Sequence, residues 1–224
     1  MAATGLLIDF GGTLDADGEP WSDRFFAAYR AAGGAVARDQ FGHAFAASDT
    51  QLAALTGVAT FDYSSTVAAQ SSLLAKLLPD GGLLEDAALQ DAFCAAAANV
   101  AGRNRKALDD LAGTYLLAVV SNFQGNLAPC LDELGLADVF DVVSDSEVVG
   151  ARKPDRRIFD ETLDQLGCDA ASCWMIGDSP PNDIAAAAAI GMDTCWVAPA
   201  ARPLPGIAPT ARVARFSDVS KVVT

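Results

Sequence analysis

Histidine is nearly absent from this sequence, in which His43 is the only one among 224 residues. A Ser-His-Asp triad, a phosphohistidine mechanism and a three-histidine zinc site each require histidine at a defined place in the fold. His43 lies in a helical-looking stretch, far along the chain from the motifs described below. The sequence therefore argues against all three chemistries.

Cysteine pairs and long apolar runs are missing as well. The five cysteines form no C-x-x-C pair, which favours reduced core residues over metal ligands or disulfides. No apolar run reaches the roughly 20 residues that span a bilayer, and the N-terminal residues lack the basic flank and apolar centre of a signal peptide. We therefore expect a cytoplasmic protein without a membrane partner.

Basic residues are scarce, since 15 Lys and Arg stand against 29 Asp and Glu, giving a net charge of -14. Such a surface repels the phosphate backbone, so we expect no nucleic-acid partner. A small anionic substrate is still compatible with this charge, because a local cluster of amides, a lysine and a metal ion can reverse the field inside one cleft.

A carboxylate follows the first apolar run of the chain, where DFGGTL at residues 9–14 comes directly after GLLI at residues 5–8. The run predicts a buried parallel strand, and Asp9 then lies at its carboxyl end, where open α/β sheets bind their ligands. The two glycines allow backbone amides to approach a phosphate closely. Taken alone, the segment is equally compatible with an Asp that only caps a turn.

Polar groups follow two further apolar segments. Residues 115–120 predict a strand that ends at Ser121 and Asn122, a hydroxyl and an amide suited to binding an oxyanion. Lys153 precedes Pro154, which suits the first turn of a helix, so we expect a cation beside a helix N-terminus. Both places attract phosphate.

A fourth apolar segment, residues 173–176, is followed by a pair of acidic residues. Asp178 and Asp183 are spaced so that both carboxylates can reach one cation. A hard divalent metal ion is the natural ligand for such oxygens.

The order Asp9, Ser121, Lys153 and Asp178 resembles the haloacid dehalogenase (HAD) superfamily, whose members carry D-x-D-x-T, a Ser or Thr, a Lys, and G-D-x-x-x-x-D. The segment GARKPDRRIF at residues 150–159 looks much like the family's sequence around its lysine. The resemblance covers residues 1–14 and about 110–200. Each motif alone is weak, but four of them at strand ends are specific.

The resemblance implies an α/β fold, with a Rossmann-like parallel sheet and helices on both faces. Residues 1–14 and 110–224 would form this core domain, and the alanine-rich residues 15–109 an inserted helical C1 cap domain, as in the phosphatase-type subgroup. The chain would return to the core through a hinge or turn at residues 102–104. Apolar periodicity predicts cap helices over 21–32, from Ser64 or Ser65 to about 78, and over 84–100. It predicts core helices over 127–134, 155–166 and 183–190. Further strands are expected over 139–143, 194–197 and 213–216.

The family also implies a role for each motif residue. Asp9 would attack phosphorus and form an aspartyl-phosphate, which water then hydrolyses. The implied cofactor is Mg²⁺, bound by Asp9, the Gly11 carbonyl and Asp178, with Asp183 in a supporting position behind them. The groups implied to bind the phosphoryl group are Gly12, Ser121, Asn122 and Lys153, of which Ser121 and Lys153 are also catalytic.

One position departs from the family pattern. Phosphatases of the superfamily carry a second Asp two residues after the nucleophile, which protonates the leaving oxygen and later activates water; here that position is Gly11. Glycine cannot transfer a proton, so we expect a slow phosphatase, one limited to good leaving groups, or one rescued by another acid. The candidate replacements are Asp15, Asp17, Glu19 and His43.

Hydrolysis of a small phosphorylated metabolite is the favoured function, and three alternatives remain. A dehalogenase also lacks the second Asp but needs no metal, whereas Asp178 and Asp183 favour one. A phosphonatase uses a cap lysine as an imine former, for which Lys76 or Lys106 is available. A weakly catalytic protein would only bind its phosphorylated ligand. The sequence is compatible with a monomer or a homodimer.

Overall fold

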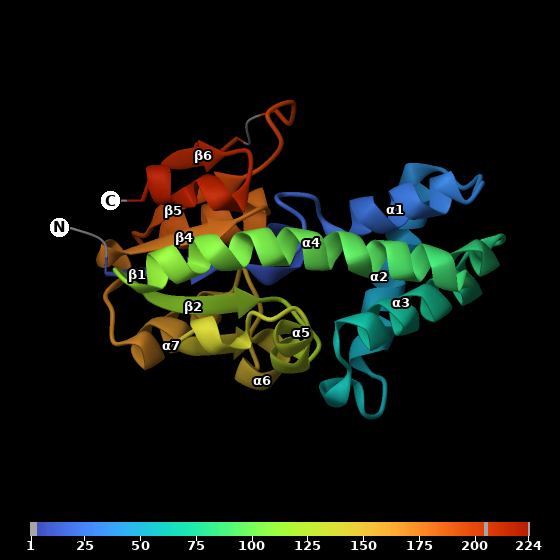
Figure 1. Ribbon diagram of the computed structural model, residues 1–224, viewed down its shortest axis with the longest axis horizontal. Coiled ribbons are helices and arrows are strands. Elements are labelled where there is room, and N and C mark those ends of the chain that lie inside the picture. Colours follow the sequence, from blue (N-terminus) through green and yellow to red (C-terminus); the bar gives the residue numbers. More distant parts are fainter. Residues whose placement is uncertain (1–3, 204–205, 224) are drawn as a thin grey trace.

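The computed structural model describes residues 4–203 and 206–223, and a six-stranded parallel sheet lies at its centre (Figure 1). The strands are β1 Gly5–Ile8, β2 Leu116–Ser121, β3 Val142–Asp145, β4 Cys173–Gly177, β5 Asp193–Val197 and β6 Ala211–Val213. Their order is β3-β2-β1-β4-β5-β6, so β1 pairs with β2 on one side and β4 on the other. The predicted α/β fold class is confirmed.

Both faces of the sheet are covered because its central strand is apolar on both sides. Leu6 and Ile8 belong to one hydrophobic cluster, together with residues of α4 (Ala87–Ala112) and α5 (Leu127–Glu133). Leu7 belongs to a second cluster on the opposite face, which includes residues of α7 (Arg156–Leu166). A strand buried on both faces needs no polar alternation, which is why its sequence is one apolar run.

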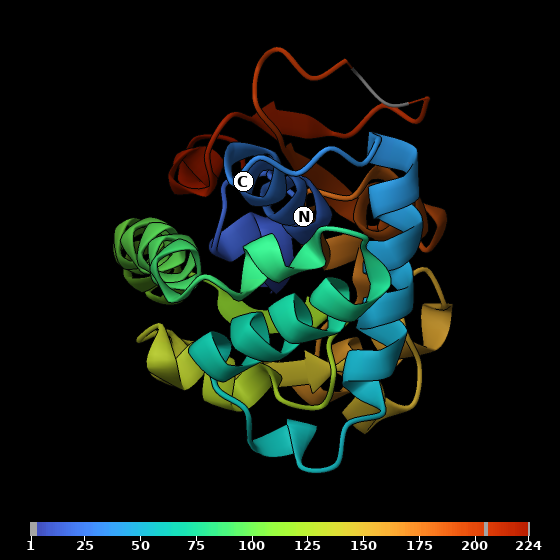
Figure 2. The same ribbon diagram turned by 90° about the vertical axis from the view of Figure 1, so that its right-hand side faces the viewer.

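A lobe of helices lies at one end of the molecule, on the right in Figure 1. It contains α1 (Trp21–Ala31), α2 (Arg38–Ala53), α3 (Tyr63–Leu77) and the first part of α4. Viewed from that end, α2 and α3 lie in front of the sheet (Figure 2). The helical insert is thus confirmed, while α2 is a helix that the sequence did not predict, because it buries only Phe41, Ser48 and Leu52 along its length.

Helix α4 joins the lobe to the sheet without a break. Residues 102–104, predicted as a hinge or turn, are helical and continuous with the residues before and after them. Asn104 is buried there and its Nδ2 donates to the Leu14 carbonyl at 3.0 Å. The turn prediction is therefore wrong, since this stretch carries a buried contact to the first motif rather than a surface loop.

Gly102→Ala should stabilise the protein by about 1 kcal/mol, because glycine is a poor helix former and a Cβ at Gly102 would meet no atom within 4 Å. Gly135→Ala is the matched control: its Cβ would also enter open space, but its φ of +67° penalises alanine. Urea unfolding of both variants tests this. Destabilisation by Gly102→Ala would show that α4 is not continuous in solution.

Three other predicted elements have different bounds in the structure. The strand predicted at 139–143 begins later, at Val142, because residues 137–139 form a helical turn held to α4 by the Arg105–Asp138 ion pair at 2.5 Å. The last strand ends at Val213 rather than continuing to Phe216, which instead starts a helical turn over Phe216–Lys221. The single helix predicted over 183–190 is divided in the structure between the helical turn Pro180–Ala185 and α8 (Ala186–Ala189).

Two helix starts also differ from the prediction. Asp62, rather than Ser64 or Ser65, caps α3, since its carboxylate accepts from the Ser65 N–H at 2.9 Å. Hydrogen bonding by Ser65, first through its side chain and then through its backbone N–H, lowers the pKa of Asp62. Pro154 lies before the cap of α7 and outside its first turn, because Asp155 is the N-cap residue and α7 starts after it.

No helix in the described part of the chain is long and apolar enough to cross a membrane. The cysteines are free thiols within that part, three of them buried: Cys130, Cys173 and Cys195.

Candidate active site

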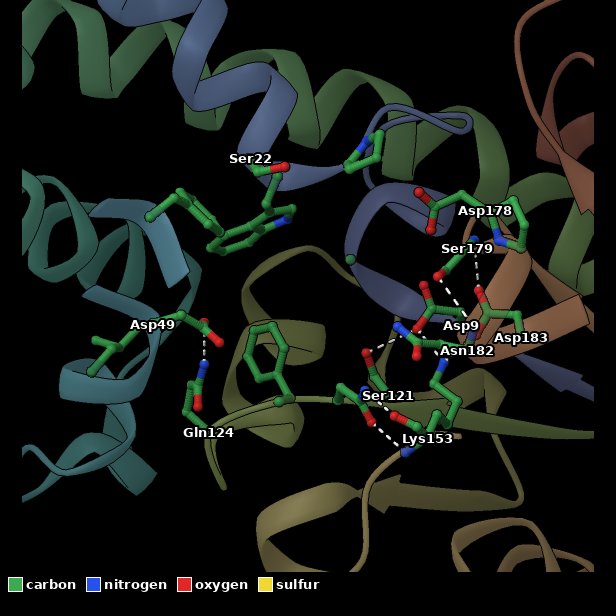
Figure 3. A pocket seen from close by; sticks show the side chains of 18 of the residues that line it. Asp9, Ser22, Asp49, Ser121, Gln124, Lys153, Asp178, Ser179, Asn182 and Asp183 are labelled. Carbon is green, nitrogen blue, oxygen red and sulfur yellow. Dashed lines mark hydrogen bonds and ion pairs between the residues drawn. The ribbon is translucent and has the colours of Figure 1, made fainter. Parts of the chain in front are cut away.

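The sheet topology brings the predicted polar residues together at one edge. Asp9 follows β1, Ser121 ends β2 and Asp178 follows β4, so the three lie at the carboxyl ends of three adjacent strands. Lys153 reaches the same place from the loop between α6 (Ser146–Val149) and α7. Figure 3 shows these side chains converging, with Asp183 beside them.

Lys153 is fully buried and paired with two carboxylates. Its Nζ lies 2.7 Å from Asp9 Oδ1 and 2.6 Å from Asp183 Oδ1, and it also donates to the Val120 carbonyl at 2.8 Å. Burial by itself lowers the pKa of Lys153, but Asp183 and Asp9 outweigh burial and raise the pKa above its usual value. Lys153 is therefore a permanent cation, held between the Asp9 and Asp183 carboxylates.

The carboxylates outnumber this one cation. Oxygen atoms of Asp9, Asp178 and Asp183 all lie within 4.8 Å of one another, and all three residues are buried. Burial, followed by the charges of Asp9 and Asp183, raises the pKa of Asp178 well above its usual value; burial raises that of Asp183 to about 6. Buried carboxylates crowded in this way fit a hard divalent cation, whose charge would offset their repulsion.

The small residues of the motifs allow this crowding. A Cβ at Gly12 would lie 2.8 Å from Asp178 Oδ2, and Gly12 also has a φ of +95°, which favours glycine. A Cβ at Gly177 would lie 2.2 Å from Asp183 Oδ2. Thr13 Oγ1 lies between the acids, 3.2 Å from Asp9 Oδ2 and 3.3 Å from Asp178 Oδ1; the sequence assigned it no role.

The groups predicted to bind phosphate have partners within the protein. Ser121 Oγ donates to Asp9 Oδ1 at 3.1 Å, in direct contact with the predicted nucleophile. Asn122 makes two hydrogen bonds to the backbone of Lys153, at 2.7 and 2.8 Å, and so fixes the loop that carries the lysine. The Gly12 N–H donates to Asp15 Oδ1 at 2.6 Å. Ser121 and Lys153 therefore both contact Asp9 directly, whereas Asn122 and the Gly12 N–H bond to other parts of the protein.

A cavity of about 350 Å³ opens in front of these residues. Asp9, Ser121, Lys153 and Asp178 line its polar end. The helical lobe and the loop after β2 contribute apolar side chains to its walls, namely Trp21, Phe45, Leu52 and Phe123. Trp21 and Phe45 pack against the hydrophobic core and line the cavity as well. The size fits a small molecule, because ligand cavities are typically about 300–1,000 Å³.

None of the four candidate replacement acids is among the described residues that line this cavity. Asp17 pairs with Arg103, while Glu19 and His43 are exposed. Asp15 is buried behind Gly12. Lys76 and Lys106 are also exposed and absent from the lining, so the cavity lacks the cap lysine that a phosphonatase would need.

Asp15 instead joins the first motif to the helical lobe. Its carboxylate accepts from the Gly12 N–H at 2.6 Å, Trp21 Nε1 at 2.7 Å, Arg24 NH1 at 2.8 Å and the Tyr63 hydroxyl at 2.7 Å. Burial lowers the pKa of Arg24, but Asp15 and Tyr63 outweigh it and raise the pKa. The members of this network are scattered over 52 positions, from Gly12 to Tyr63, so no local sequence pattern indicated it.

Asp15→Asn should destabilise the protein by about 3 kcal/mol, because it leaves the buried Arg24 guanidinium without its counter-charge. The control Asp109→Asn, which removes the exposed partner of Arg105, should change stability little. Urea unfolding measures both. Equal midpoints for Asp15→Asn and the native protein would contradict a structural role for this ion pair.

Comparison with known proteins agrees with the fold and the motif order. The family model described as haloacid dehalogenase-like hydrolase matches residues 4–191, most of the chain, and the chain belongs to this family. It is therefore a hydrolase of the HAD superfamily.

Among curated relatives, pyrimidine 5'-nucleotidase YjjG of Escherichia coli K12 is 34% identical over 52% of this chain and 53% of its own length. Phosphoglycolate phosphatase of Mesorhizobium japonicum is 37% identical over 35% of this chain and 34% of its own. The matches thus span about half or less of each relative.

Two solved structures share the whole fold. The HAD-hydrolase YfnB of Bacillus subtilis, bound to magnesium, has a TM-score of 0.61 at 21% identity, over the full length of both chains. L-2-haloacid dehalogenase of Xanthobacter autotrophicus has a TM-score of 0.60 at 19% identity, over 100% of this chain and 98% of its own. Phosphatase and dehalogenase names both occur among the matches. Similarity to known proteins therefore defines the fold and the hydrolase class, and the reaction has to be inferred from the residues of the site.

Proposed function

We propose that this chain hydrolyses small phosphomonoesters, with Asp9 as the nucleophile. The observation that carries the proposal is the buried Lys153–Asp9 pair at 2.7 Å beside Asp178 and Asp183, where these residues line a cavity of ligand size. A dehalogenase has no use for this excess of carboxylates, whereas a phosphatase binds both a metal ion and a dianionic substrate there. The relatives named as a nucleotidase and a phosphatase agree with this choice.

The residues fit Mg²⁺, which we propose as the cofactor. Asp9, Asp178 and the Gly11 carbonyl would hold the ion, and Asp183 would support the site through its bond to Lys153. When bound, the ion supplies positive charge that neutralises phosphate oxygens and lowers the repulsion between substrate and carboxylates.

The reaction uses the chain's own residues as follows. Asp9 attacks phosphorus, so that a bond from its carboxylate oxygen to phosphorus forms while the bond to the ester oxygen breaks. The ester oxygen departs with the electron pair of that bond and takes a proton from solvent. Water then attacks the same phosphorus: a bond from the water oxygen to phosphorus forms while the bond from phosphorus to the Asp9 oxygen breaks. The Asp9 carboxylate is regenerated, inorganic phosphate is released and one proton of the attacking water passes to solvent. Ser121 and Lys153 stabilise the phosphoryl oxygens throughout.

We infer that residues 15–109 act as a C1-type cap over this site. In support, residues of both parts line one cavity, among them Trp21 and Asp49 from the insert and Asp9 and Lys153 from the core. Helix α4 belongs to both parts, because Asn104 already contacts Leu14 of the first motif. Closing the insert over the cavity would exclude water from the first step.

Magnesium dependence tests the cofactor assignment. Native protein treated with EDTA and freed of metal should hydrolyse p-nitrophenyl phosphate at least about 10²-fold more slowly than protein supplied with Mg²⁺, because the carboxylates then repel the substrate. Added Mg²⁺ should restore the rate, and Ca²⁺, which prefers a larger and looser shell of oxygen ligands, should restore less. Full activity in EDTA would contradict this part of the proposal.

A further inference from the structure

The cavity has a second polar end, formed by Asp49 of α2 and Gln124 of the loop after β2. Both residues line the cavity, and Gln124 Nε2 donates to Asp49 Oδ1 at 2.6 Å. Figure 3 places this pair across the cavity from Asp9 and Lys153. A general acid for the reaction must lie within hydrogen-bond reach of the leaving oxygen, so Asp49 is poorly placed to replace the acid missing at Gly11.

The side-chain oxygen atoms of this pair accept fewer hydrogen bonds from the protein than they could. Among the described residues, Gln124 is the one hydrogen-bond donor to the half-buried Asp49 carboxylate, and none donates to the Gln124 amide oxygen. Burial raises the pKa of Asp49, while the Arg152 charge and the Gln124 bond lower it. Burial removes part of the hydration of this carboxylate, and one hydrogen bond from the protein replaces only some of it. A further hydrogen-bond donor on a ligand would therefore stabilise the carboxylate.

Apolar side chains contribute to the walls of the cavity as well. Trp21, Phe45, Leu52 and Phe123 line it, and the Trp21 and Phe123 rings are in edge-to-face contact at 6.0 Å. A substrate that reaches both ends therefore has a phosphate at one end, apolar atoms that contact these walls, and a polar group at the other end.

We propose that Asp49 and Gln124 bind an amino group at the far end of the leaving group, so that the protein selects phosphomonoesters carrying an amine remote from the phosphate. An ammonium group has three donors and no acceptor, which matches two neighbouring oxygen acceptors, one of them charged. A hydroxyl group can donate only one hydrogen bond to these oxygen atoms, and a methyl group can donate none. This inference rests on the proposed phosphatase function.

Two esters with closely similar phenolic leaving groups provide the test: tyramine O-phosphate, which carries a terminal amine, and 4-ethylphenyl phosphate, which lacks it. The native protein with Mg²⁺ should show a kcat/KM at least about tenfold higher for the amine, because charge-assisted hydrogen bonds are the strong ones. Asp49→Asn should bring the ratio of the two values close to one. Asp39→Asn, which removes an exposed charge from the same helix, should preserve the native ratio.

Two results would overturn the inference: a native ratio close to one, or a tenfold ratio that persists in Asp49→Asn. A loss of rate that is equal for both esters in Asp49→Asn would show that the Asp49–Gln124 bond only holds α2 against the core loop. Calorimetric binding of the same esters to Asp9→Asn separates the two proposals. If the native protein hydrolyses neither ester while Asp9→Asn binds the amine at least about tenfold more tightly, the phosphatase proposal fails and the amine site stands.

Discussion

Asp9→Asn should lower kcat for p-nitrophenyl phosphate by about 10³-fold or more, because an amide oxygen cannot form the aspartyl-phosphate. The variant also removes the charge opposite Lys153, whose Nζ lies 2.7 Å from Asp9 Oδ1. Asparagine has the same shape as aspartate, and Asp183 still pairs with Lys153 at 2.6 Å, so we expect the fold to be retained. Steady-state kinetics with Mg²⁺ and a thermal unfolding curve measure the two effects.

Asp110→Asn is the control for this loss, since Asp110 is exposed on α4 and pairs only with the exposed Lys106. It should leave kcat unchanged. Retention of a tenth or more of the native rate by Asp9→Asn would mean that water attacks phosphorus directly and that Asp9 only binds the cation.

Gly11→Asp should increase kcat/KM for an alkyl ester such as glycerol 2-phosphate by about 10²–10⁴-fold, because this is the usual rate enhancement from general acid-base catalysis. The backbone at Gly11 has a φ of -72° and a ψ of 113°, which any residue adopts. A Cβ there would lie 3.5 Å from Trp21 Nε1, an ordinary contact. Gly11 already lines the cavity, so the substitution adds a carboxyl group to its wall.

The gain should be much smaller for p-nitrophenyl phosphate, because its leaving group departs without a proton. Gly11→Asn is the matched control, as it adds a side chain of the same size that cannot act as an acid. An equal gain for Gly11→Asp and Gly11→Asn would point to packing against Trp21. No gain for the alkyl ester would show that proton transfer to the leaving group does not limit the native protein.

The strand ends of this protein could be predicted from sequence because each combines two strong local signals. An apolar run followed at once by a polar group fixes both the strand and the end at which the group lies, as for Asp9 and Ser121. The parallel sheet then requires these groups to meet at one edge. The same logic placed Asp178 correctly beside Asp9.

Features that depend on long-range packing could not be predicted. Helix α2 has a weak apolar pattern, so Asp49 was not recognised as a residue of the cavity. The glycine at 102 suggested a turn, yet the helix continues because its neighbours on α4 are packed, Ala101 and Asn104 being fully buried. Asp15 was considered as a catalytic acid, whereas contacts with Arg24 and Tyr63 of two different helices give it a structural role.

Trapping the covalent intermediate tests the central claim most directly. Native protein, Mg²⁺ and p-nitrophenyl phosphate are mixed, quenched in acid within the turnover time and reduced with borohydride, which converts an aspartyl-phosphate to homoserine. Peptide mass spectrometry should then find homoserine at position 9 and at no other aspartate, in an amount that depends on substrate and Mg²⁺. Turnover with unmodified Asp9, or with homoserine at another aspartate, would contradict the assignment of Asp9 as the nucleophile.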